Sequence, residues 1–229
     1  MKKYEFLLFD FDGTLADYDR TESWSLAEAF RQAGLPYNED ICLAEYHRIN
    51  SQMWKSFEQG GISAPELRLR RFRMLFESCG IQGDPELVAG MYLSSLAESA
   101  FLFPGVLPLL EKLRPRYKLG LITNGLKEVQ RRRLALSGTD KYMSGIAISD
   151  EIGIQKPSVG IFEYALHEAG HTDKSTVLVI GDSLSSDIQG GINFGIDTCW
   201  FNPGRKAAAA GIVPMYEITR LDELPGILE

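Results

Sequence analysis

The fold is decided by the stretch Phe6-Leu7-Leu8-Phe9-Asp10-Phe11-Asp12-Gly13-Thr14-Leu15, in which a nearly continuous apolar run gives way to two acidic residues. Such a run is typical of a strand buried on both faces of a parallel sheet. Residues two apart on an extended chain point the same way, so Asp10 and Asp12 should face one crevice. Neighbouring carboxylates repel each other unless a proton or cation intervenes, and Mg²⁺ is the hard cation that suits oxygen ligands. Alone, the pair could equally be solvated acids in a loop.

Further apolar runs with polar ends follow, and amphipathic segments separate them. Strands are predicted at residues 119–124, 146–150, 177–182 and 198–202, and helices at 105–117, 127–136, 159–169 and 184–194. This alternation favours an open, parallel α/β sheet, in which ligands bind outside the carboxyl ends of the strands.

About a hundred residues between the first two strands break this alternation and are predicted to be helical. Ser63 and Glu66 have the spacing of a capping box, and Asp84-Pro85 is a typical helix start. Helices are expected at residues 21–34, 38–57 and 63–79 and from residue 84 onward. We therefore predict a helical cap domain at 16–95, inserted into a core formed by 1–15 and 96–229.

The composition restricts the class of protein. The chain has 229 residues, of which 45% are hydrophobic, and a net charge of −7, so it can bury a sizeable core and is not disordered. The acidic balance argues against nucleic acid or an anionic membrane as a partner. The sequence has no apolar run as long as a membrane span and no signal-peptide core, and its three cysteines form no CxxC motif. We expect a cytoplasmic protein that binds a small molecule.

Other predicted strands also end in acidic or polar residues, or are followed by them. Asp182 and Asp187 follow one strand, Thr123 and Asn124 end another, and Lys156 lies in the loop after a third. Each has an ordinary interpretation as a turn residue, a surface charge or an acid in the first turn of a helix. Their agreement at several strand ends favours one shared site, because the carboxyl ends of parallel strands meet at one edge of the sheet.

The ordered set DxDGT, Thr, Lys and GDxxxxD resembles the haloacid dehalogenase superfamily over essentially the whole chain. The resemblance implies a Rossmann-like core with helices on both faces of an open parallel sheet, and an α-helical cap inserted after the first motif. It implies a phosphatase rather than a dehalogenase, because the dehalogenases of the superfamily generally lack the second aspartate. The absence of membrane spans argues against the ion-pumping branch.

The resemblance also implies a role for each motif residue. Asp10 would be the nucleophile that forms an aspartyl-phosphate, and Asp12 the general acid and base. Asp10, the backbone carbonyl of Asp12, and Asp182 would hold Mg²⁺. The phosphoryl oxygens would be bound by Thr123, Asn124 and Lys156. Asp187 would orient the metal site and Lys156. These roles suit phosphoryl transfer, which depends on alignment and charge neutralisation.

Charge counting indicates the order of binding. Asp10, Asp12, Asp182 and Asp187 bring up to four negative charges against one positive charge from Lys156. A phosphate dianion should therefore be rejected until Mg²⁺ is present.

Within the superfamily, the chain is similar to the nucleotidases that hydrolyse noncanonical pyrimidine nucleoside monophosphates. The similarity lies in Ile49-Asn50-Ser51-Gln52-Met53-Trp54, Gly61-Ile62, Arg71-Phe72, Ile122-Thr123-Asn124-Gly125, Ser186-Asp187-Ile188-Gln189-Gly190-Gly191-Ile192-Asn193 and Thr198-Cys199-Trp200-Phe201-Asn202. It implies a 5′-nucleotidase for dUMP, dTMP or UMP. We separately expect a monomer or weak homodimer. The chain departs from that group at Gly13, where an acidic residue is common.

Several alternatives stay open. The same core would serve a phosphoglycolate or sugar-phosphate phosphatase or a phosphosugar mutase, and a noncatalytic phospholigand sensor could also keep the fold. Aromatic residues of the insertion could stack on a base, although aromatics at helical spacing more often form a core. The candidates for substrate specificity are Tyr18, Trp24, Trp54 and Arg71.

Overall fold

The computed structural model describes residues 4–208 and 211–228 and divides the chain into two compact units. One unit contains Met1–Tyr18 and Ala100–Glu229, and the other contains Asp19–Ser99. The first unit is therefore assembled from two separate segments of the chain, and the second is a single continuous insertion.

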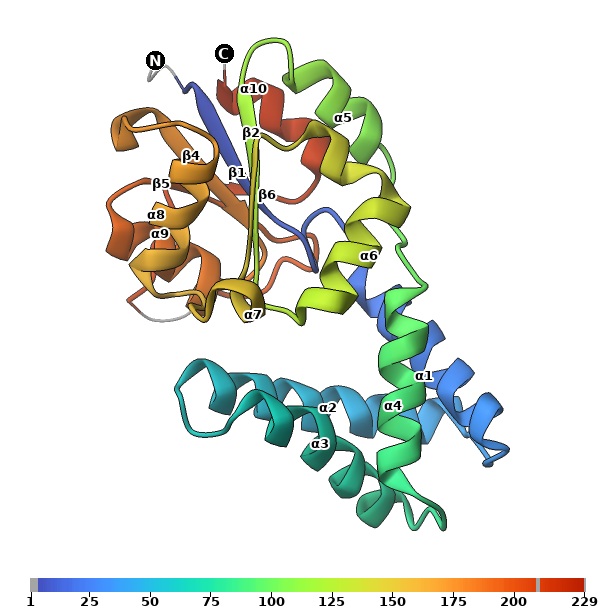
Figure 1. Cartoon of the computed structure of the whole chain (residues 1–229). Helices are drawn as coiled ribbons and strands as arrows, with labels where there is room; N and C mark the ends of the chain where they lie inside the picture. Colours follow the sequence, from blue (N-terminus) through green and yellow to red (C-terminus); the bar gives the residue numbers. More distant parts are fainter. Residues whose placement is uncertain (1–3, 209–210, 229) are drawn as a thin grey trace. The chain divides into compact units, whose positions relative to one another are not determined.

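The first unit is built on a six-stranded sheet with the order β3-β2-β1-β4-β5-β6, in which every neighbouring pair is parallel (Figure 1). Its strands are β1 Phe6–Asp10, β2 Lys118–Thr123, β3 Gly145–Ile148, β4 Val177–Gly181, β5 Asp197–Phe201 and β6 Tyr216–Ile218. The chain leaves β1 toward β2 on one side and later returns to β4 on the other. The order therefore reverses at β1, where sheets of this type bind ligands.

Helices cover both faces of the sheet. They are α5 Val106–Leu113, α6 Lys127–Ser137, α7 Ser149–Ile152, α8 Val159–Glu168, α9 Gln189–Phe194 and α10 Leu224–Leu228. Side chains of β1 alternate between two apolar clusters: Leu7 and Phe9 pack with residues of α5, α6 and α10, whereas Phe6 and Leu8 pack with α8 and α9. The predicted fold class, a Rossmann-like parallel sheet with helices on both faces and a helical insertion, is confirmed.

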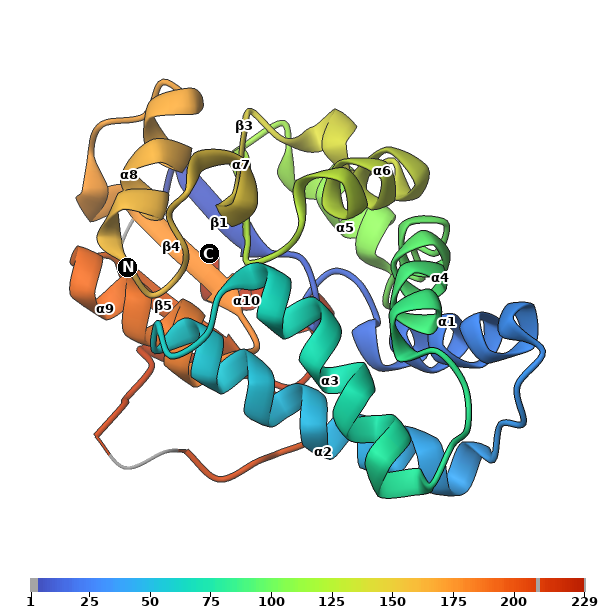
Figure 2. The ribbon, with the colours of Figure 1, turned by 60° about the horizontal axis from the view of Figure 1, so that its bottom comes forward.

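The second unit consists of four helices, α1 Tyr18–Ala33, α2 Glu39–Glu58, α3 Ala64–Cys79 and α4 Pro85–Ala97, of which α1 begins at the last residue of the first unit. The capping box predicted before α3 is formed, because the Ser63 side chain accepts from the backbone of Glu66 and the Glu66 side chain accepts from the backbone of Ser63. Asp84 caps α4 by accepting from the backbone N–H groups of Glu86 and Leu87, and Asn38 caps α2 by accepting from the backbone N–H of Ile41. Helices α2 and α3 lie side by side (Figure 2).

Three details differ from the expectations. The third strand ends at Ile148, because Ser149 and Asp150 begin α7. The helix expected from residue 184 begins as a π-helical turn, Leu184–Ile188. Strand β6 was not predicted, because it is three residues long, lies at the sheet edge and has an acidic residue at its centre. Among the described residues, none of the helices combines the length and the apolar character that a bilayer span requires.

Candidate active site

The predicted site residues of the core come from neighbouring strand ends. Asp10 is the last residue of β1 and pairs with Ile122 of β2, while Asp182 directly follows β4. Thr123 ends β2 and is buried. Strands β2, β1 and β4 are adjacent in the sheet, so their carboxyl ends bring these side chains to the place where the strand order reverses.

Three carboxylates gather at this edge. Asp10, Asp182 and Asp187 each offer an oxygen, and these oxygens all lie within 4.8 Å of one another. Asp10 and Asp187 are buried, and Asp182 is partly buried. The sequence predicts that Asp10 and Asp182 converge, and the structure brings them together with Asp187.

Lys156 balances part of this negative charge. Its Nζ donates hydrogen bonds to Oδ1 of Asp10 at 2.5 Å and to Oδ1 of Asp187 at 2.7 Å. Burial alone would lower the pKa of this ammonium group, but the carboxylates of Asp10 and Asp187 outweigh burial, so the pKa is raised. Lys156 is therefore a permanent buried cation between two acids.

Lys156 does not neutralise all the negative charge of these carboxylates. Burial raises the pKa of Asp10 well above its usual range; Lys156 opposes this rise, whereas Asp187 and Asp182 add to it. Burial and then Asp187 raise the pKa of Asp182 to about 7. Oδ2 of Asp10 is buried and has no hydrogen-bond partner among the described residues. A buried oxygen without a donor, beside two further carboxylates, fits a hard divalent cation with oxygen ligands.

The two oxygens of Asp187 are already engaged. Oδ1 accepts from Lys156, and Oδ2 accepts from the backbone N–H of Ser183 at 3.0 Å. Both oxygens of Asp187 are thus held by donors of the chain, whereas only Oδ1 of Asp10 is.

Asn124 contacts the loop that carries Lys156. Its side chain accepts a hydrogen bond from the backbone N–H of Lys156 at 2.8 Å and donates one to the backbone carbonyl of the same residue at 3.0 Å. These two bonds hold the Lys156 backbone beside the end of β2, so Asn124 orients the loop from which the Lys156 side chain extends.

Asp12 has two partners on α6 that were not predicted from the sequence. Its carboxylate accepts hydrogen bonds from Arg133 at 2.6 Å and from Gln130 at 2.9 Å. Both residues lie on α6, three positions apart, and therefore on one face of that helix. The available signal was their spacing on the first helix after Thr123, but Arg133 stands in a run of three arginines that reads as a solvated surface.

The comparisons with known proteins agree with this arrangement. A family model described as haloacid dehalogenase-like hydrolase matches residues 7–201, which includes every strand-end residue named above. The chain belongs to the haloacid dehalogenase-like hydrolases. It is therefore an enzyme, and the family predicted from the four motifs is confirmed.

Relatives within the haloacid dehalogenase-like hydrolases span the whole chain. HAD-hydrolase YfnB of Bacillus subtilis strain 168 is 36% identical over 100% of this chain and 97% of its own length. Pyrimidine 5′-nucleotidase YjjG of Escherichia coli K12 is 34% identical over 99% of this chain and 98% of its own length. Pyrimidine 5′-nucleotidase PynA of Streptococcus pneumoniae R6 is 36% identical over 99% and 95%.

A solved structure of one of these relatives is similar to this chain over its whole length. The crystal structure of YfnB from Bacillus subtilis superposes with a TM-score of 0.94 at 36% identity and covers 100% of both chains. That crystal form is described as bound to magnesium and as revealing interdomain movement in YfnB.

Two glycines of the hydrolase motifs are required by close approaches. Gly13 has a φ of 90°, and a Cβ atom there would lie 2.6 Å from Oδ2 of Asp182. A Cβ on Gly181 would overlap the carboxylate of Asp187. The glycine at position 13 thus leaves room for the Asp182 carboxylate.

The predicted specificity residues have different surroundings. Trp24 is 42% exposed on α1, and Trp54 contacts Phe57 edge to face. The Tyr18 ring lies 5.9 Å from the Arg133 guanidinium.

Arg71 is 3% exposed and lies within the helical unit, where its guanidinium is close to the rings of three aromatic residues, Tyr46, Phe72 and Tyr92. It donates to the Asn50 side chain at 2.8 Å, and Asn50 donates to Glu22 at 2.6 Å. Arg71 therefore belongs to a buried polar network of α1, α2 and α3.

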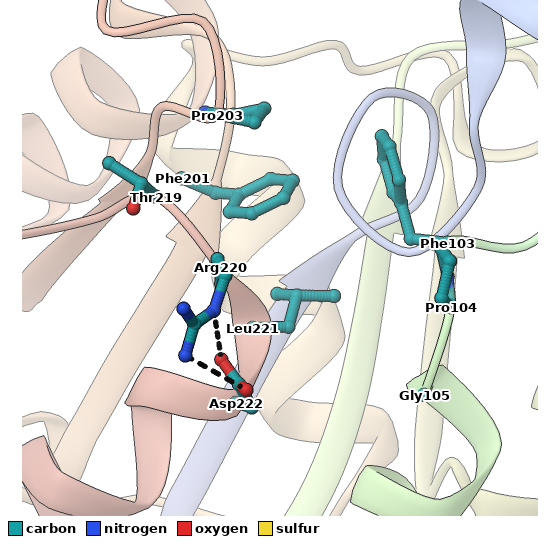
Figure 3. A pocket seen from close by; sticks show the side chains of 9 residues that line it. All are labelled: Phe103, Pro104, Gly105, Phe201, Pro203, Thr219, Arg220, Leu221 and Asp222. Atoms are coloured by element: carbon teal, nitrogen blue, oxygen red, sulfur yellow. Dashed lines mark hydrogen bonds and ion pairs between the residues drawn. The ribbon is translucent and has the colours of Figure 1, made fainter.

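The first unit also contains a largely apolar pocket of about 410 Å³ (Figure 3). The rings of Phe103 and Phe201 line it and meet edge to face with centroids 5.5 Å apart, and an ion pair between Arg220 and Asp222 lies at its edge. The lining residues are Phe103, Pro104, Gly105, Phe201, Pro203, Thr219, Arg220, Leu221 and Asp222. None of the predicted site residues lines this pocket.

Proposed function

We propose that this hydrolase is a Mg²⁺-dependent phosphomonoesterase that cleaves nucleoside 5′-monophosphates. The observation that carries the proposal is the Asp10 carboxylate, which has one oxygen held by Lys156 and the other buried without a partner among the described residues. Such a carboxylate is oriented, desolvated and available to attack phosphorus. Phosphatases and nucleotidases among the relatives support the reaction class.

Asp10 and Asp182, with the backbone carbonyl of Asp12, are the proposed ligands of Mg²⁺. Asp187 is assigned to orienting Lys156, because both of its oxygens already accept hydrogen bonds from the chain. A bound Mg²⁺ would neutralise the charge of the carboxylates and of the transferring phosphoryl group. The description of YfnB as magnesium-bound supports this choice of cation.

The proposed reaction has two steps. In the first, a carboxylate oxygen of Asp10 bonds to phosphorus, the bond from phosphorus to the ester oxygen breaks, and the Asp12 carboxyl gives its proton to the leaving oxygen. In the second, water attacks the aspartyl-phosphate and gives a proton to Asp12, and the bond from phosphorus to Asp10 breaks. The products are a nucleoside and inorganic phosphate, and both aspartates return to their starting states.

Lys156, Thr123 and Asn124 are proposed to hold the phosphoryl group. The Lys156 ammonium and the Thr123 hydroxyl lie at the same strand ends as Asp10 and can donate to phosphoryl oxygens. Asn124 contributes by holding the Lys156 backbone, as its two hydrogen bonds to that residue indicate.

The substrate class rests on the relatives. YjjG and PynA are pyrimidine 5′-nucleotidases by name, and each is at least 34% identical over nearly the whole chain. We propose a pyrimidine nucleotide such as dUMP, dTMP or UMP as the small phosphorylated partner, in the cytoplasm. The helical insertion, predicted at 16–95, is proposed to act as a cap domain that sets specificity through Tyr18, Trp24, Trp54 or Arg71.

The test is release of inorganic phosphate from a panel of nucleoside monophosphates and sugar phosphates, with Mg²⁺ and after metal removal by a chelator. We expect pyrimidine monophosphates to be cleaved fastest, activity to vanish in chelator and added Mg²⁺ to restore it. Asp10→Asn should abolish turnover while the far-UV circular dichroism spectrum stays unchanged.

Other outcomes identify the alternatives. Preference for a sugar phosphate would favour the class of the glyceraldehyde 3-phosphate phosphatase of Methanopyrus kandleri, which is 31% identical over 95% of this chain. Isomerisation of a sugar phosphate with little release would indicate a mutase. Binding without any turnover would indicate a sensor, and full activity in chelator would refute the role of Mg²⁺.

A further inference from the structure

Both carboxylate oxygens of Asp12 are held by residues of α6. Nη1 of Arg133 donates to Oδ1 of Asp12 at 2.6 Å, and Nε2 of Gln130 donates to Oδ2 at 2.9 Å. The Arg133 side chain is 0% exposed, whereas that of Asp12 is 22% exposed. Asp12 is therefore fixed from its buried side and open on the other.

The two donors are themselves fixed. Nη1 of Arg133 also donates to Oε1 of Gln130 at 3.0 Å, and Nε2 of Gln130 also donates to the Thr123 hydroxyl at 2.6 Å. The Arg133 guanidinium lies 5.0 Å from the centroid of the Phe11 ring and 5.9 Å from that of Tyr18. Hydrogen bonds and ring contacts thus restrict the guanidinium to one orientation, which it imposes on Asp12.

We propose that Arg133 is the positioning residue of Asp12, which it holds at the angle needed to pass a proton to the leaving oxygen and to take one from water. This proposal rests on the acid and base role of Asp12 proposed above. A carboxylate oxygen has two acceptor positions, so an oxygen that accepts one hydrogen bond keeps another for the reacting proton. Arginine stays charged throughout, so its hold on Asp12 persists through both steps.

The fixed orientation matters most when the leaving group needs a proton. The leaving group of an alkyl ester such as a nucleoside monophosphate is the nucleoside, which departs as a strongly basic alkoxide unless an acid protonates its oxygen. The nitrophenolate of p-nitrophenyl phosphate leaves without such help. Loss of a positioned general acid should therefore slow the first ester far more than the second, whereas general damage to the site slows both equally.

The experiment compares Arg133→Met with the wild-type full chain in Mg²⁺. The esters are p-nitrophenyl phosphate and dUMP, or whichever alkyl monoester the wild type cleaves fastest. We expect kcat/KM for the alkyl ester to fall by about 10²-fold, with a far smaller fall for p-nitrophenyl phosphate. Because water activation also depends on Asp12, p-nitrophenol release should acquire an initial burst. Equal falls in kcat/KM for the two esters would overturn the proposal.

Asp12→Asn supplies the reference. It should show the same contrast between the two esters, and adding Arg133→Met to it should cause little further loss, because both changes remove one function. Full additivity of the two changes would overturn the positioning role. Arg131→Met is the matched control, since Arg131 lies on the same helix but pairs with Glu151 at the surface; it should leave both esters unaffected.

Two further results keep the conclusion unambiguous. Should Arg133→Met fail to fold, Arg133→Lys keeps the charge but loses the planar fork, and the same contrast, smaller in size, is expected; equal losses on the two esters would again refute the proposal. If Asp12→Asn slows the alkyl ester more than p-nitrophenyl phosphate but the Arg133 variant does not, the positioning role of Arg133 is refuted and the role of Asp12 is kept. Absence of the contrast in Asp12→Asn refutes the proposed function of Asp12 as well.

Discussion

Gly13 has little freedom to change, because two independent restrictions act on it. Its φ of 90° disfavours any residue with a side chain, and a Cβ would lie 2.6 Å from Oδ2 of Asp182. We expect Gly13→Ala to lower the free energy of unfolding by about 1–3 kcal/mol. It should also raise the Mg²⁺ concentration needed for activity, because the Asp182 carboxylate must move. Urea unfolding and Mg²⁺ titration of phosphate release measure these effects.

Gly34→Ala separates the effect of backbone strain from the effect of a clash with a neighbouring side chain. Gly34 also has a positive φ, 65°, but no heavy atom lies within 4 Å of the position of its Cβ. This control should lose stability through backbone strain while keeping the Mg²⁺ requirement of the wild type. An equal change of Mg²⁺ requirement in both variants would remove Asp182 from the proposed ligand set.

The strand-end residues of the site were predictable from the sequence, because the topology of a parallel sheet carries them to one edge. Asp10, Thr123 and Asp182 each follow an apolar run, and no knowledge of side-chain packing was needed to place them. Arg133 and Gln130 were not predictable in this manner. They reach Asp12 from the middle of a helix, and only the packing of α6 decides which of three consecutive arginines faces inward.

At the scale of elements, one polar network joins three helices of the insertion. Asn50 of α2 donates to Glu22 of α1 and accepts from Arg71 of α3, and all three side chains are buried. We expect Asn50→Leu to lower the free energy of unfolding by about 1–3 kcal/mol, because each charged neighbour loses a buried hydrogen bond. Urea unfolding followed by tryptophan fluorescence measures this loss.

The exposed Ser51 of the same helix provides the comparison. Ser51→Ala should change the free energy of unfolding by less than about 0.5 kcal/mol, as is usual for surface positions. If Asn50→Leu were as stable as Ser51→Ala, the three helices would not depend on the network.

Helix starts were predictable where a side chain caps them, as at Ser63 and Asp84, because capping is local chemistry. Elements without a local signal were missed. Strand β6 exists because β5 offers it an edge, and its three residues would not form a strand alone. The short α7 likewise replaces the end of a predicted strand.

At the scale of the whole molecule, a net charge of −7 is combined with three acids that meet at one edge of the sheet. A fold that concentrates like charges in this manner sacrifices stability for function. The sequence indicated that the charges would meet, but how strongly burial acts on each of them depends on the packing around it.

The raised pKa of Asp182 predicts how the stability of the metal-free protein changes with pH. Without a cation, burial and Asp187 raise its pKa from 3.8 to about 7. A carboxyl with a raised pKa in the folded state stabilises the fold fully below pH 4, and its contribution is lost as the pH rises through about 7. The metal-free protein should therefore unfold at a lower temperature at pH 8 than at pH 5, and Asp182→Asn should reduce this difference by raising the melting temperature at pH 8.

The same variant should lose the stabilisation that Mg²⁺ provides. Binding to the folded state adds about 2.7 kcal/mol at a hundred times Kd, and each kcal/mol raises Tm by roughly 2–4 °C in a chain of this size. Thermal unfolding at pH 8 in chelator and in rising Mg²⁺ should show a shift of Tm in the wild type and little in Asp182→Asn. Asp222→Asn makes the same change in net charge at an exposed ion pair with Arg220 and should keep the full shift. Equal shifts in wild type and Asp182→Asn would mean that Mg²⁺ binds elsewhere, because a lost ligand must weaken binding at its own site.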